Sequence, residues 1–209
     1  MSPLILRVDS GEPDLAVVRR AADMIRDGLV VAYPTDTLYG LAVDPRNAPA
    51  VRRLFDLKGR PEASALTLIA ADVAQVRMAA TMTAAAERLA AQWWPGPLTV
   101  VLDAVPVLAA EMLAGGRTVG IRVPRHAVAV ALARAAGFPV TATSANRSGE
   151  PSTSTPGAAG EALPHVDAIL DAGPAPGGPP STIVNAAARD VVLVRAGVVP
   201  WDRVLRSLE

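Results

Sequence analysis

The chain has 209 residues, with 20 basic and 20 acidic side chains, two histidines and no cysteine. This length suits one domain that buries a substantial core without disulfide bonds or a structural metal. An apolar share of 51% and a net charge of zero exclude a disordered chain and a polybasic protein that wraps nucleic acid. The lack of cysteine excludes disulfides, zinc–thiolate sites and thiol nucleophiles.

The hydrophobic pattern predicts helices and strands that alternate along the chain. Apolar residues recur at helical spacing from Leu15 to Ile25, and Gly28 ends that helix. The apolar run that follows is typical of a buried strand, which Pro34 closes. In chain order we expect a helix over 14–27, a strand over 29–33, a helix over 47–57, a strand over 65–70, a helix capped by Asp72, a helix over 83–94, a strand over 98–102, a short helical stretch over 107–113, a strand over 117–123, a helix over 126–136, strands over 140–143 and 166–170, a hairpin of 181–184 with 191–195, and a helix over 201–208.

Interleaved helices and strands predict an α/β protein, and the late hairpin argues against a purely parallel sheet. Two stretches rich in Ser, Thr, Pro or Gly, at 150–160 and 173–180, are predicted to be loops. They are too short to separate a second domain, so we expect a single domain over 1–209. No apolar run approaches the roughly 18 residues that cross a membrane, and we expect a cytoplasmic protein.

Two stretches of small polar residues directly follow predicted strands. In Tyr33-Pro34-Thr35-Asp36-Thr37-Leu38-Tyr39-Gly40-Leu41, hydroxyls and a carboxylate stand where α/β sheets commonly bind ligands. In Ser144-Ala145-Asn146-Arg147-Ser148-Gly149, hydroxyls, an amide and backbone N–H groups suit a phosphate or a ribose. Taken alone, each stretch is also explained as an ordinary turn, because Thr, Asp, Ser and Asn favour turns.

Lys58 is the single lysine of a chain that otherwise carries 19 arginines. It stands in Lys58-Gly59-Arg60-Pro61, at the end of a predicted helix. Two cations beside a glycine could converge on phosphates, with arginine as a fork and lysine as a point charge. The alternative is a surface position at which both cations complement the helix macrodipole.

An arginine interrupts the apolar strand predicted over 117–123. Alternation in Thr118-Val119-Gly120-Ile121-Arg122-Val123-Pro124 places Thr118, Gly120 and Arg122 on one face. A buried arginine needs an anionic partner, which is either a carboxylate of the protein or an anionic ligand. His126, shortly after, is interpreted as a helix-start residue.

Three further stretches complete the pattern: Trp94-Pro95-Gly96-Pro97-Leu98-Thr99, Ser181-Thr182-Ile183-Val184 and Arg195-Ala196-Gly197. In this order, the stretches make the chain resemble the YrdC-like family, the threonylcarbamoyl-AMP synthases of tRNA modification, in their short single-domain form. The resemblance covers about residues 29–197. It implies a twisted mixed sheet flanked by helices around a large concave cavity, without an extra C-terminal domain.

The resemblance implies a nucleotidyltransferase that joins L-threonine, bicarbonate and ATP into threonylcarbamoyl-adenylate and releases pyrophosphate. Mg²⁺ would arrive with ATP and be held largely by phosphate oxygens and water, with no metal site on the protein itself. The implied partners are the proteins that transfer the threonylcarbamoyl group to tRNA, and any contact with tRNA itself would be weak.

The family pattern, carried over position by position, implies three groups of site residues. The threonine contacts would be Thr35, Arg122, the backbone at Ala142, and Ser181. The catalytic groups facing the ATP phosphates would be Lys58 and Arg60. The remaining nucleotide contacts would be Ser64, Thr118, Ser144, Asn146, Ser152 and Arg195.

At two places the chain departs from the family pattern, the first of them in comparison with the long members of the family. Those members often read Pro-Leu-Ile-Val-His, with a substrate-contacting histidine, where this chain reads Ala65-Leu66-Thr67-Leu68-Ile69 and resembles the short bacterial branch. One threonine contact is therefore left unassigned. Pro179-Pro180 stands where many relatives carry a glutamate.

Two other functions remain open. One is an enzyme that makes carbamoyl-adenylate from carbamoyl phosphate. The other is a non-catalytic RNA-binding module, which the zero net charge and few aromatic residues disfavour.

Overall fold

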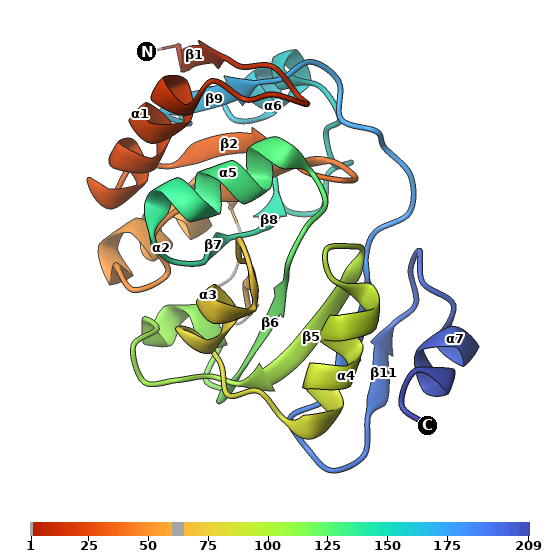
Figure 1. Ribbon diagram of the computed structural model, residues 1–209. Coiled ribbons are helices and arrows are strands. Elements are labelled where there is room, and N and C mark those ends of the chain that lie inside the picture. Colours follow the sequence, from red (N-terminus) through yellow and green to blue (C-terminus); the bar gives the residue numbers. More distant parts are fainter. Residues whose placement is uncertain (1, 60–64) are drawn as a thin grey trace.

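The computed structural model describes residues 2–59 and 65–209, and within them the strands form two mixed sheets (Figure 1). The first sheet has the order β1 (Leu4–Arg7), β9 (Ala168–Asp171), β2 (Val31–Pro34), β3 (Tyr39–Ala42) and β8 (Thr143–Ser144). The second has the order β11 (Val192–Arg195), β10 (Thr182–Asn185), β5 (Leu98–Asp103), β6 (Thr118–Arg122), β4 (Thr67–Ile69) and β7 (Val140–Thr141). The helices are α1 (Leu15–Arg26), α2 (Ala48–Lys58), α3 (Val73–Arg77), α4 (Ala84–Trp93), the 3₁₀ helix η1 (Ala110–Leu113), α5 (Ala127–Ala136), α6 (Pro156–Ala162) and α7 (Trp201–Arg206).

The first sheet is covered on both faces. Helices α1 and α5 pack against each other over one face (Figure 1), and Val31 and Tyr33 of β2 point into that layer. Ala32, between them, points to the opposite face, where it joins side chains of α2 and α6. Because successive strand residues alternate between faces, a strand buried on both sides needs the unbroken apolar run that β2 has.

The chain passes from the second sheet to the first at Ala142. Strand β7 pairs antiparallel with β4, and β8, one residue later, pairs antiparallel with β3. Thr67 fixes this crossing, because its carbonyl accepts the Ala142 N–H at 2.8 Å and its Oγ1 donates to the Ala142 carbonyl at 2.8 Å. The two sheets therefore meet side by side at Ala142, and Thr141 adds to the joint because its Oγ1 donates to the Leu41 carbonyl at 2.8 Å.

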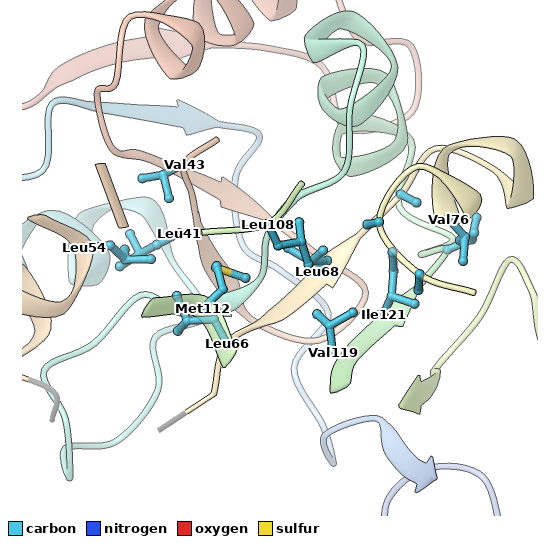
Figure 2. Packing of buried hydrophobic residues seen from close by; sticks show 14 of the residues in the cluster. Leu41, Val43, Leu54, Leu66, Leu68, Val76, Leu108, Met112, Val119 and Ile121 are labelled. Atoms are coloured by element: carbon cyan, nitrogen blue, oxygen red, sulfur yellow. The ribbon is translucent and has the colours of Figure 1, made fainter. Parts of the chain in front are cut away.

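The larger hydrophobic core receives side chains from both sheets and from α2, α3 and η1. Burial of this apolar surface is the main favourable contribution to folding. Figure 2 shows part of this cluster, with Leu41, Val43, Leu54, Leu66, Leu68, Val76, Leu108, Met112, Val119 and Ile121 labelled.

The structure confirms the mixed α/β fold and most of the predicted elements. Helix α2 begins after Asn47, whose side chain accepts the Ala50 N–H, and ends at Gly59 in the left-handed conformation. The late hairpin is β10 with β11, paired antiparallel. His126 is at the N-cap of α5, as interpreted from the sequence.

Other parts of the sequence prediction were incomplete. The strands form two sheets, and β3 lies inside a stretch that was interpreted only as polar turn. Helix α6 lies partly in a predicted loop, because its small residues and glycines give a weak helical signal. Thr155 caps it by accepting the Ala158 N–H, and Pro156 occupies the first turn. Of the helical stretch predicted over 107–113, only the 3₁₀ turn of η1 forms.

Candidate active site

Residues of both sheets line a cavity of about 350 Å³. Most of its wall is polar, with hydroxyl groups of threonine and serine side chains from several strands and loops and two arginines. Several predicted site residues meet there, although they are far apart in the sequence. The predicted residues in the wall are Thr35, Arg122, Ala142, Ser144, Ser152, Ser181 and Arg195.

Thr35 begins the turn between β2 and β3 and is almost fully buried. Its Oγ1 donates to the Leu38 carbonyl at 2.7 Å and accepts the Leu38 N–H at 3.3 Å. The stretch is therefore a threonine-capped turn, as one interpretation of the sequence predicts, and it also forms one side of the cavity.

Arg122 lies at the end of β6, and only 9% of its side chain is exposed. Its Nη1 is 3.2 Å from Oδ2 of Asp36, so the protein carboxylate predicted as one alternative is present. The arginine still lines the cavity, and Gly120, on the same strand, lies against two of the threonines in the cavity wall. A Cβ at Gly120 would be 3.0 Å from Thr67 Cγ2 and 3.3 Å from Thr99 Cγ2, so glycine allows these two threonines to approach each other.

Arg195, on β11, brings a second guanidinium to the cavity. It donates to the carbonyl of Ser181 at 2.8 Å and lies 3.3 Å from the Ser181 hydroxyl, which in turn is 2.9 Å from Thr99 Oγ1. Burial, together with the positive charge of Arg122, lowers the pKa of Arg195. Two partly desolvated like charges at one cavity favour an anionic ligand between them.

Tyr39 also lines the cavity and donates from Oη to the Gly173 carbonyl at 2.7 Å. Burial raises the pKa of Tyr39 to about 12. The phenol is therefore neutral at physiological pH, where it serves as a fixed hydrogen-bond donor.

Lys58 is buried, which excludes the alternative of a surface cation. Its Nζ donates to the carbonyl of Asn146 at 2.7 Å and to the carbonyl of Ser144. The Asn146 side chain is buried as well, and its Nδ2 donates to the carbonyls of Arg147 and Glu150. Lys58 thus lies beneath the cavity wall at Ser144 and holds the loop that forms it.

The described structure does not place five of the predicted residues in the wall. Two of them, Lys58 and Asn146, lie behind it at Ser144. Thr118 shares a strand face with Arg122 but does not line the cavity, whereas Arg60 and Ser64 lie outside the described residues. Sequence reasoning missed Thr67 and Thr99, which the structure adds to the wall. A threonine inside an otherwise apolar strand was the signal that could have indicated them.

His126 yields a prediction about stability and pH. Its Nδ1 is buried without a hydrogen-bond partner among the described residues, and burial lowers the pKa of His126 below 6.5, an effect that the Asp36 carboxylate partly opposes. The unfolded chain therefore binds a proton more readily, so the free energy of unfolding falls as the pH drops below about 6.5. In His126→Gln this part of the fall should be absent. Denaturant titrations at about pH 7 and about pH 5 measure it, and an equal loss in both proteins would contradict the assignment.

Among residues 2–59 and 65–209, no three His, Cys, Asp or Glu side chains are grouped so that they could hold a metal ion. Over the same ranges, no helix has the length and apolar character needed to cross a membrane.

Comparison with known proteins places the chain in a family. A family model described as telomere recombination, for the Sua5, YciO and YrdC proteins, matches residues 23–197. The chain is 36% identical over 200 residues to the threonylcarbamoyl-AMP synthase of Bacillus subtilis, covering 94% of this chain and 57% of that protein. It is 51% identical over 134 residues to the threonylcarbamoyl-AMP synthase of Halorhodospira halophila, covering 63% of this chain and 69% of that protein.

A solved structure agrees in both fold and sequence. The crystal structure of P. abyssi Sua5 complexed with L-threonine matches with a TM-score of 0.92 and 34% identity, covering 98% of this chain and 60% of that one. The chain thus spans a little over half the length of the B. subtilis relative and three-fifths of the P. abyssi chain. Since the family model matches most of the sequence, the chain belongs to the Sua5/YciO/YrdC family.

Proposed function

We propose that the chain is an L-threonylcarbamoyladenylate synthase, which condenses L-threonine, bicarbonate and ATP into threonylcarbamoyl-AMP and pyrophosphate. The observation that carries the proposal is a hydroxyl-rich cavity flanked by Arg122 and Arg195 in a chain whose relatives bear the name threonylcarbamoyl-AMP synthase. All three substrates are anionic or carry a carboxylate, which suits such a cavity.

The reaction requires the protein to position its substrates and does not require a nucleophilic side chain. The threonine amine adds to the carbon of bicarbonate, and loss of water leaves a carbamate. A carbamate oxygen then attacks the α-phosphorus of ATP, and the bond to the β-phosphate oxygen breaks to release pyrophosphate. The protein has to align two anions and offset the charge that grows on the phosphates.

Within this proposal, Arg122 pairs with the threonine carboxylate, and Thr35, the Ala142 backbone and Ser181 enclose the amino acid. Magnesium accompanies ATP and is bound by its phosphate oxygens and water. Lys58 supplies a positive charge beneath Ser144, where it also fixes the loop wall. The remaining nucleotide contacts stay predictions: Arg60, Ser64, Thr118, Ser144, Asn146, Ser152 and Arg195.

The proposal also covers the protein that uses the product and the cellular location of the reaction. The adenylate is an activated carbonyl, so a second protein must accept the threonylcarbamoyl group and pass it to tRNA. A cytoplasmic location is part of the same proposal and rests on the sequence alone.

The test is pyrophosphate release by the purified protein. Release from Mg²⁺–ATP should require L-threonine and bicarbonate together, because the attacking carbamate cannot form from either one. Leaving out each component in turn is the control. Release that depends on carbamoyl phosphate in place of threonine would instead favour a carbamoyl-adenylate-forming enzyme. No release in any combination, together with tight RNA binding, would favour an RNA-binding module.

A further inference from the structure

Asp36 is not among the residues that line the cavity, but it links the β2–β3 turn to the end of β6, which form two parts of the cavity wall. It lies in the turn between β2 and β3, in the first sheet, and only 16% of its side chain is exposed. Its Oδ2 accepts the backbone N–H of Arg125 at 3.1 Å and lies 3.2 Å from Nη1 of Arg122. Both donors belong to the end of β6 and the loop that follows it, in the second sheet.

The backbone N–H of Arg125 gives this carboxylate a fixed anchor. If the Asp36 carboxylate were bound only to the flexible Arg122 side chain, the two groups could move together. The additional hydrogen bond from the Arg125 backbone N–H ties the carboxylate to the main chain. A guanidinium carries five N–H donors in a rigid plane, so Arg122 can bind Asp36 and a second anion at the same time. Asp36 therefore sets the plane and direction of the group that Arg122 presents to the cavity.

The neighbouring charges make this orientation necessary. Arg122 and Arg195 both line the cavity, so their guanidinium groups repel each other. Burial lowers the pKa of Arg195, and the charge of Arg122 adds to this effect. Asp36 offsets one of these charges from behind. Without it, Arg122 would lose this carboxylate partner, and repulsion by Arg195 would favour orientations that turn the Arg122 side chain away.

We propose that Asp36 is a positioning residue that holds Arg122 in the orientation which receives the carboxylate of the amino-acid substrate. This inference rests on the proposed function and adds a residue to its site. It assigns Asp36 no contact with substrate, so its effect must pass through Arg122.

The test compares Asp36→Asn with a matched control. Asparagine keeps the shape but loses the charge, and the KM for threonine should rise about tenfold, while kcat and the KM for ATP change less than about twofold.

The control is Asp44→Asn. Asp44 forms an ion pair with Arg46 at 2.7 Å and accepts the Arg46 backbone N–H at 2.9 Å, and neither residue is among those that line the cavity. Its loss should lower the melting temperature without raising the KM for threonine.

A double mutant separates positioning from an independent role. In an Arg122→Gln background, Asp36→Asn should change the KM for threonine by less than about twofold, because the group it positions is gone. An Asp36→Glu variant, which keeps the charge, should give a KM between those of the wild type and Asp36→Asn.

Three results would overturn the proposal. An unchanged KM in both Asp36 variants is one, and an equal rise in KM with and without Arg122 is another. If the wild type itself releases no pyrophosphate with threonine, the proposed function fails and the positioning role fails with it. An active wild type with unaffected Asp36 variants overturns the positioning role alone.

Discussion

Replacing Lys58 with alanine is expected to lower turnover by about two to three orders of magnitude, the scale of losing one preorganised electrostatic group. The change removes a buried positive charge beneath the cavity wall and leaves the carbonyls of Ser144 and Asn146 without this donor. The measurement is the steady-state rate of pyrophosphate release, with the melting temperature recorded for each variant. That second reading distinguishes a slow enzyme from an unfolded one.

Lys58→Arg is the matched variant for this prediction. Arginine keeps the charge, but a planar fork does not reproduce a compact ammonium that fits between two carbonyls, so it should restore only part of the rate. Wild-type turnover in Lys58→Ala would show that the buried lysine only stabilises the loop.

Arg122→Ala is expected to weaken threonine binding by about 2–5 kcal/mol and ATP binding far less, because it removes one partner of a buried charge pair with the substrate carboxylate. Isothermal titration calorimetry with each ligand measures the two affinities separately. The change also leaves the Asp36 carboxylate without its guanidinium partner, so the melting temperature should fall as well.

Arg122→Lys provides the control, since it keeps a positive charge beside Asp36. Its fold should be closer to the wild type, while threonine binding should remain weaker because lysine cannot bind a carboxylate with two parallel hydrogen bonds. Intact threonine affinity in a destabilised Arg122→Ala protein would assign the arginine to a purely structural ion pair with Asp36.

Much of the secondary structure could be predicted from the sequence, because the periodicity, capping and turn residues of several elements are unambiguous. The amphipathic period of α1, the Asn47 cap and the Gly59 stop of α2, and the hairpin of β10 with β11 all came from neighbouring residues. The identity of the polar stretches also indicated where a site would form, and several of their residues meet in one cavity.

Long-range pairing was the part that local patterns could not supply. The need of Arg122 for an anionic partner followed from its strand, but its pairing with Asp36 depends on how the two sheets come together. Lys58 at a helix end resembled a surface cation because its burial depends on a loop 86 residues later. Strand β3 was missed because the turn residues before it masked the signal of a four-residue strand.

The most direct test of the proposed reaction is the fate of the bicarbonate carbon. The protein is incubated with ATP, magnesium, L-threonine and carbon-13-labelled bicarbonate. The nucleotide products are then separated by chromatography, and their masses are measured by mass spectrometry. We predict a threonylcarbamoyl-adenylate that carries one labelled carbon, formed together with pyrophosphate. When Lys58 is replaced by alanine, the labelled adenylate should form about two to three orders of magnitude more slowly. Conversion of ATP to unlabelled AMP or ADP, with no labelled adenylate from the wild-type protein, would contradict the account.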